Sequence, residues 1–244
     1  MVLRSLFSHA LPVAFVAALL VAGCVEIPSE GHTPPDYKAS VRVMYVDPAI
    51  TASASINVAE GPSFGSFSTS IFPSGSFGTV TGYTTVNAGG KQLFLSPGDA
   101  DTSALTIAAD QRGTLLVLPR SSTADPRFLL NGEGRLFEPT GIEGSSRVQF
   151  INAITGGMAD TTNIAVDVYR TSDSTTVVTN LAFGAASADV LVEEGVSEGF
   201  YLTRAGATGA LGTAVTITGA SNTDYTMVGS GSADAATLSS FRNE

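Results

Sequence analysis

The sequence predicts an all-β protein in which two tandem antiparallel β-sandwich modules, of the immunoglobulin-like kind, follow a signal peptide and a short tether. Three observations predict this fold. Short apolar or alternating runs separated by turn residues fill the chain from Ser40 onward. The order of these runs repeats once along the chain. No segment carries the 3.6-residue apolar period of an amphipathic helix over three turns.

The apolar runs have the length and composition of β-strands. They are rich in β-branched residues and are bounded by Gly, Pro, Asn, Asp and Ser. Runs of this kind, with turn residues at short intervals, are typical of a sandwich. In chain order they are VRVMYV, SINVA, YTTVNA, KQLFLS, ALTIAA, GTLLVLP, RFLLNG, RVQFINA, NIAVDVY, TTVVTNLAF, ADVLVEE, FYLTRA, TAVTITG and DYTMVGSG.

The second half of the chain repeats the first. Four matches occur in the same order, each offset by roughly 106 to 110 residues, which shared β composition does not explain. The matched pairs are Ser40–Ala49 with Ser146–Ala153, Ser55–Ala59 with Asn163–Asp167, Ser76–Gly89 with Ala182–Gly195, and Leu105–Leu118 with Val215–Val228. We therefore predict one module at 38–139 and a second at 145–238, each of ordinary domain size.

The motifs of the second module resemble those of the bacterial domain of unknown function 4397 family. They are Asn152 after the first strand, Val166–Tyr169, Leu181–Gly184 and Tyr225–Gly229. The first module departs from the pattern, because Ala59 replaces an acid and an insertion at 61–78 displaces the Phe-Gly pair. The resemblance spans nearly all of 40–238. It implies an exported β-sandwich module, often in tandem, and brings no known catalytic residues.

Each module carries a Phe-Gly pair, Phe77-Gly78 and Phe183-Gly184. We expect the ring to fill the core of its module. The glycine is expected to supply the positive φ or the close approach that the next turn requires.

Residues 1–23 have the pattern of a secretory signal peptide. One basic residue, Arg4, precedes a continuous apolar stretch from Ala10 to Ala22. That stretch is too short for a comfortable membrane-spanning helix, which needs about 20 apolar residues. Val21–Cys24 resembles a bacterial lipobox. The resemblance implies that residues 1–23 are cleaved and that Cys24, the only cysteine, carries a covalent lipid, with no other cofactor expected.

Residues 24–37 are predicted to form a lipidated tether. Pro, Gly and acids are mixed there without apolar periodicity. Two or three acyl chains, at about 0.8 kcal/mol per buried CH₂, suffice for stable anchoring. Residue 25 is Val rather than the Asp that resembles an inner-membrane retention signal. The expected location is therefore the cell envelope, and the outer membrane of a Gram-negative bacterium in particular.

The composition of the body excludes several classes of function. Both histidines, His9 and His32, precede the predicted modules, so the modules contain neither His nor Cys. Ser-His-Asp and Cys-His catalysis and the usual zinc, copper, haem and iron–sulfur ligand sets are therefore excluded. Lys38 and Lys91 are the only lysines, and the formal net charge is −10. Without a basic patch, nucleic acid is not an expected partner.

Acidic residues offer two weak chemical hypotheses. Asp99, Asp101 and Asp110 superficially resemble a calcium loop, but Ala104 replaces the required glycine, so an EF-hand is not predicted. A looser calcium site there stays open. A second group of acids suggests glycosidase chemistry, which needs two carboxyl groups across a sugar. Its members are Asp189, Glu193, Glu194 and Glu198. The chain contains no Trp, which weakens the case for sugar binding.

The insertion at Gly61–Gly75 is the best candidate for a contact loop. Its four large apolar side chains stand amid glycine and serine, where exposure to water is costly. They are Phe64, Phe67, Ile71 and Phe72. Either the loop folds back over the first module, or it contacts the second module, the membrane or a partner.

The features together favour a non-catalytic function. The expected protein is a lipid-anchored cell-envelope protein whose modules bind or support an envelope protein or glycan, and it is not expected to be an enzyme. One alternative is an envelope hydrolase that uses carboxylates only, with or without calcium. The other is a passive spacer or stalk.

Overall fold

The computed structural model describes residues 37–60, 71–97, 102–120, 126–135, 142–156 and 162–243. Tyr37–Glu244 forms one compact unit. The predicted signal peptide and the tether up to residue 36, with Cys24, lie outside the described residues, as do Phe64, Phe67, Asp99 and Asp101.

The first half of the unit, here the first module, contains seven strands in two sheets. One sheet has the order β3-β1-β6-β7 and the other the order β2-β4-β5. The strands are β1 Lys38–Tyr45, β2 Ser55–Glu60, β3 Thr84–Asn87, β4 Gly89–Ser96, β5 Ser103–Ile107, β6 Gln111–Val117 and β7 Phe128–Arg135.

The second half, here the second module, contains eight strands in two sheets. Their orders are β11-β8-β14-β15 and β10-β9-β12-β13. The strands are β8 Ser145–Thr155, β9 Val166–Arg170, β10 Thr176–Leu181, β11 Val190–Glu193, β12 Ser197–Arg204, β13 Ala210–Thr218, β14 Thr223–Ser232 and β15 Thr237–Asn243. Because β15 ends at Asn243, the second module continues past the predicted end at 238.

The predicted all-β class is confirmed, since every element of the described residues is a strand. The two modules share their strand order: β3-β1-β6-β7 corresponds to β11-β8-β14-β15, and β2-β4-β5 to β9-β12-β13. In each module the central pair, β1 with β6 and β8 with β14, is parallel, whereas all other pairs are antiparallel. The sequence did not predict that parallel pair.

The structure shifts one part of the predicted repeat by a residue. The Gly78 N–H donates to the Tyr45 carbonyl, and the Gly184 N–H donates to the Asn152 carbonyl, each at 2.8 Å. The bridge between Met44 and Val80 likewise matches that between Ile151 and Ala186. Arg42 therefore corresponds to Gln149, and Ser40 to Arg147 rather than to Ser146. A one-residue slip in a strand exchanges its two faces.

Each module has its own hydrophobic core between its two sheets. In the first, Val43 and Tyr45 of β1 meet Ile56 of β2 and Leu93 of β4. In the second, Phe150 of β8 meets Phe200 of β12 edge to face, with ring centroids 5.1 Å apart. Such aromatic pairs add about 0.5–1.5 kcal/mol beyond the area that they bury.

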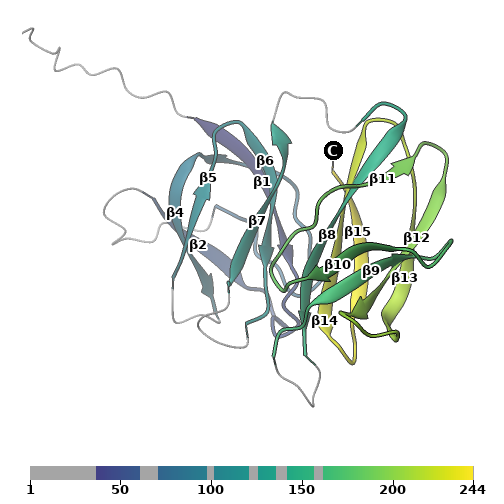
Figure 1. Cartoon of the computed structure of the whole chain (residues 1–244). Coiled ribbons are helices and arrows are strands. Elements are labelled where there is room, and N and C mark those ends of the chain that lie inside the picture. The colour runs from purple at the N-terminus through teal and green to yellow at the C-terminus, as the bar shows by residue number, and fades with distance from the viewer. Residues whose placement is uncertain are drawn as a thin grey trace, which may run out of the picture. The chain divides into compact units, whose positions relative to one another are not determined.

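A third apolar cluster joins the two modules. Met44 and Leu116 alternate with the core residues of β1 and β6, so they face away from the first core and meet Ile151 and Val228 of the second module. The full buried set is Met44, Val46, Leu116, Leu118, Ile151, Ala153 and Val228. The central strands of the two inner sheets are thus buried on both faces. Figure 1 shows the resulting layers in order: the sheet that contains β2, β4 and β5, the sheet of β1, β6 and β7, the sheet of β8, β14 and β15, and the sheet of β10, β9, β12 and β13.

In the Phe-Gly pairs the glycines are as predicted, but the rings are not. Gly78 and Gly184 have φ of 82° and 70°, the left-handed region that glycine adopts without strain. The rings, however, do not enter the module cores. Phe77 is 41 % exposed, and Phe183 packs against the cluster between the modules. The sequence pattern fixed the turn but carried no information on which face of the sheet the ring would cover.

Tyr45 gives the fold a pH dependence that can be measured. Its hydroxyl donates hydrogen bonds to the carbonyls of Pro73 at 2.9 Å and Ala54 at 3.3 Å, and burial raises its pKa to about 12. The folded state therefore holds the proton more tightly than the unfolded state, so the stabilisation is complete below pH 10 and is lost as the pH rises through 12. A chemical-denaturation series from pH 9 to 12 should show a loss of roughly 2–3 kcal/mol from this group. Tyr45→Phe should flatten that part of the curve, and an unchanged curve would contradict the assignment.

Candidate functional site

The structure removes Phe72 from the predicted contact loop, because its side chain is buried in the core of the first module. Ile71 packs against that core but is only partly buried, so part of its side chain stays exposed. The stretch that follows is closely packed, since a Cβ on Gly75 would lie 2.6 Å from the Tyr45 ring.

The calcium hypothesis gains no support from Asp110. This residue is exposed in the turn between β5 and β6, with φ of 56°. Asp99 and Asp101 are outside the described residues. Within the residues that the structure does describe, no group of three or more His, Cys, Asp or Glu side chains is placed to hold a metal ion.

Two of the four acids proposed for glycosidase chemistry share a pocket, and the other two do not line it. Glu193 and Glu198 line one pocket of about 300 Å³ together with Arg170, whereas Asp189 lines a different pocket. Glu198 is buried, and the Ser172 hydroxyl donates to its two oxygens at 3.0 and 2.9 Å. Glu194 lines neither of these two pockets.

The strongest candidate site is the polar end of the junction between the modules. Arg42 is 7 % exposed there, on the face of β1 that points away from the first core. Its Nε donates to Thr114 Oγ1 at 2.7 Å, and its Nη2 donates to Glu133 Oε1 at 2.9 Å. The same guanidinium donates to Asn243 Oδ1 at 2.6 Å and to the Arg242 carbonyl at 3.2 Å. One side chain of the first module thus holds the last strand of the second.

Tyr83 completes the surroundings of Glu133. The guanidinium groups of Arg42 and Arg112 each lie 5.2 Å from the centroid of its ring. The Tyr83 hydroxyl donates a hydrogen bond to Glu133 Oε2, and the Thr114 hydroxyl donates another to Oε1. Burial, reinforced by the Glu133 carboxylate, raises the pKa of Tyr83. Glu133 is therefore a fully paired carboxylate whose side chain has no exposed surface.

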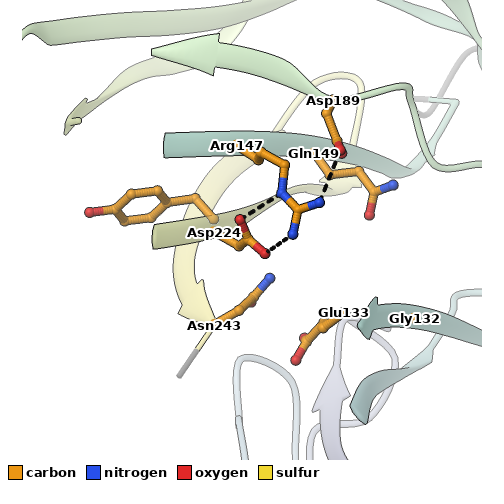
Figure 2. Close-up of a pocket in the computed structure, with 8 residues that line it drawn as sticks. Gly132, Glu133, Arg147, Gln149, Asp189, Asp224 and Asn243 are labelled. Atoms are coloured by element: carbon orange, nitrogen blue, oxygen red, sulfur yellow. Dashed lines mark hydrogen bonds and ion pairs between the residues drawn. The ribbon is translucent and has the colours of Figure 1, made fainter. Parts of the chain in front are cut away.

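Beside this network lies a polar pocket of about 180 Å³, hereafter the junction pocket (Figure 2). Arg147 is at its centre. Its Nε and Nη2 donate to the two oxygens of Asp224 at 2.9 and 2.6 Å, and its Nη1 lies 3.9 Å from Asp189 Oδ2. The hydrogen bonds to Asp224 raise the pKa of Arg147. Lining residues come from both modules: Gly132, Glu133, Arg147, Gln149, Asp189, Asp224, Tyr225 and Asn243.

An apolar groove of about 200 Å³ also lies on the junction. The first module contributes Met44–Val46, Phe77 and Gly78. The second contributes Val228, Ser230, Thr237, Ser239 and Phe241. The exposed Phe77 ring therefore lines this groove rather than the core for which the sequence predicted it.

The junction was not predicted from the sequence, although one signal for it was present. Val43–Val46 and Leu115–Leu118 are continuous apolar runs, and a strand buried on only one face shows alternation instead. Such runs indicate burial on both faces. They could have predicted that these strands face a second layer, but not which one.

Comparisons with known proteins leave the family open. Neither a scan against protein-family models nor a search of curated proteins found a match to this chain. The resemblance to the domain of unknown function 4397 family thus stays a prediction. Among the described residues, no helix has the length and hydropathy that crossing a membrane requires.

Proposed function

We propose that this chain is a lipid-anchored cell-envelope protein whose two β-sandwich modules act together as one rigid, non-catalytic binding unit. The observation that carries the proposal is the junction. An apolar cluster and the Arg42 network both connect residues of the two modules. Two modules joined only as a flexible tandem would not need a buried guanidinium shared between them, since burying a charge is costly unless it is fully paired.

The pairing of charges favours binding over hydrolysis. A general acid or base must exchange a proton with a reacting atom. In the junction, Glu133 is held by Arg42 and Asp224 is held by Arg147. These carboxylates support structure. The presence of two pockets at the contact between modules favours a binding unit over a passive spacer, because ligand sites occur preferentially at such interfaces.

The proposed anchor is the lipid on Cys24, and the proposed location is the outer membrane. Support comes from the apolar stretch before Cys24, the small residues Ala22 and Gly23, and Val25 in place of Asp. The partners expected there are the membrane, through the lipid, and an envelope protein or glycan, through the modules.

Cys24→Ser should leave the precursor uncleaved and abolish labelling by an acyl-chain probe during growth, because the thiol that is acylated is gone. Cys24→Ser combined with Ser29→Cys is a matched control that keeps one cysteine in the tether. It should also stay unlabelled, since the thiol has left the lipobox-like sequence. Labelling of either variant would overturn the anchor. Recovery of a single envelope component with the wild-type protein tests the binding function separately.

A further inference from the structure

We propose that the junction pocket binds one neutral sugar unit of a glycan. This inference rests on the proposed binding function and names the class of ligand. It assigns the ligand to a site built from both modules rather than to the loops at the ends of the sandwiches.

The charges of the pocket disfavour an ion of either sign. Arg147 stands at its centre, while Asp189, Asp224 and Glu133 surround it (Figure 2). An anion would meet the carboxylates of Asp189 and Asp224, since Glu133 is paired with Arg42 and has no exposed surface. A cation would meet the guanidinium of Arg147 at close range. A neutral ligand that both donates and accepts hydrogen bonds avoids both costs. Sugar hydroxyls have that property.

The hydrogen-bonding groups that have no partner within the pocket include both donors and acceptors. Among the contacts of the described residues, Arg147 Nη1 makes no hydrogen bond and has only Asp189 near it, at 3.9 Å. Gln149 uses its Nε2 to donate to the Ser187 carbonyl at 3.1 Å, which leaves Oε1 as an acceptor. Asn243 uses one amide hydrogen for Thr226 Oγ1 at 3.1 Å and keeps a second. The pocket therefore offers donors and acceptors side by side.

These groups are held in place before any ligand arrives. Two hydrogen bonds to Asp224 fix the plane of the Arg147 guanidinium, and Arg42 and Thr226 fix the amide of Asn243. Fixed planar groups lose little conformational entropy on binding, which favours affinity for a small ligand.

The size of the pocket limits the ligand to one ring. Its volume of about 180 Å³ lies below the roughly 300–1,000 Å³ of sites that enclose drug-sized molecules. A longer glycan would insert its terminal unit and leave the rest outside.

The test is ligand-observed saturation-transfer NMR on the full lipidated chain, kept in a polyoxyethylene detergent because a sugar-headed detergent would compete. The probes are methyl glucoside, methyl galactoside and N-acetylglucosamine, with inorganic phosphate and methylammonium as ionic controls. We expect at least one sugar to bind and neither ion to compete with it. Failure of all three sugars to bind at about 10 mM, or competition by phosphate or methylammonium, would overturn the proposal.

Two variants locate the binding. The Asp189 side chain is 44 % exposed, and Gln149→Ala removes one part-buried hydrogen bond, to the Ser187 carbonyl, so both variants should fold. Each should weaken sugar binding by about tenfold, the effect of one lost hydrogen bond to a charged or fixed polar group. Glu194→Ala removes the same charge as Asp189→Ala at an exposed position outside the pocket and should change the affinity less than twofold. Equal effects of Asp189→Ala and Glu194→Ala would place the sugar elsewhere. A negative result here leaves the anchored binding unit intact if an envelope protein is still recovered with the wild type.

Discussion

Arg42→Ala should destabilise the folded unit by about 3–5 kcal/mol, because it leaves the Glu133 carboxylate buried without its cation. The Glu133 side chain has no exposed surface and lies 2.9 Å from Arg42. The variant also removes the two hydrogen bonds to Asn243 and to the Arg242 carbonyl. Urea unfolding at neutral pH measures the loss as a shift of the midpoint at constant slope.

A second arginine at the junction supplies a control for this experiment. Arg147 pairs with Asp224 at 2.6 Å, and its own side chain is 32 % exposed whereas that of Asp224 is 8 % exposed. Because Asp224 lines the junction pocket, where water can reach it, Arg147→Ala should cost less than Arg42→Ala, about 1–3 kcal/mol. If both variants lower the free energy of unfolding by the same amount, burial does not explain the contribution of the Arg42–Glu133 pair.

A double variant separates loss of pairing from loss of packing. Arg42→Met with Glu133→Leu removes both charges and keeps apolar volume, so it should recover part of the stability lost in Arg42→Ala. Full recovery is not expected, since the hydroxyls of Thr114 and Tyr83 lose their acceptor. A double variant less stable than Arg42→Ala would contradict the pairing argument.

The strands were predictable because their signals are local. VRVMYV became the core of β1 and GTLLVLP became β6, each bounded by the turn residues that ended the run in the sequence. Gly78 and Gly184 were predictable for the same reason, since a turn that needs positive φ selects glycine whatever surrounds it.

The junction was not predictable because its partners are remote. Arg42 and Asn243 are separated by 201 positions, and no periodicity connects them. The match between β1 and β8 was one residue off in the sequence, because the hydrogen bonds that place Tyr45 and Asn152 at equivalent positions come from turns elsewhere in the chain. Glu133 stands next to an irregularity in the β6–β7 ladder, where the pairing shifts between Arg112 and Gly113, and such a shift redirects a side chain without a signal in composition.

Substitutions at Leu115 and Leu116 test the core of the first module and the junction separately. They are adjacent in β6 and both have no exposed surface. Leu115 packs in the core of the first module, and Leu116 packs in the cluster that joins the modules. The same substitution at the two positions therefore differs only in which interface receives it.

Leu115→Asp should unfold the first module, because an unpaired carboxylate cannot be accommodated in a closed core and no alternative packing exposes it to water. Leu116→Asp should instead separate the modules. The charge becomes solvated once the junction opens, and each module keeps its own core. The single cooperative unfolding transition should then split into two.

Hydrogen exchange followed by mass spectrometry distinguishes these outcomes peptide by peptide. Leu115→Asp should remove protection from β1 and β6 while β8, β12 and β14 stay protected. Leu116→Asp should preserve protection in the strands of both cores. It should lower the free energy of opening of each module. If Leu116→Asp strips protection from β1 and β6 as fully as Leu115→Asp does, the first module has no stability of its own. The junction would then be part of one indivisible core rather than a contact between two.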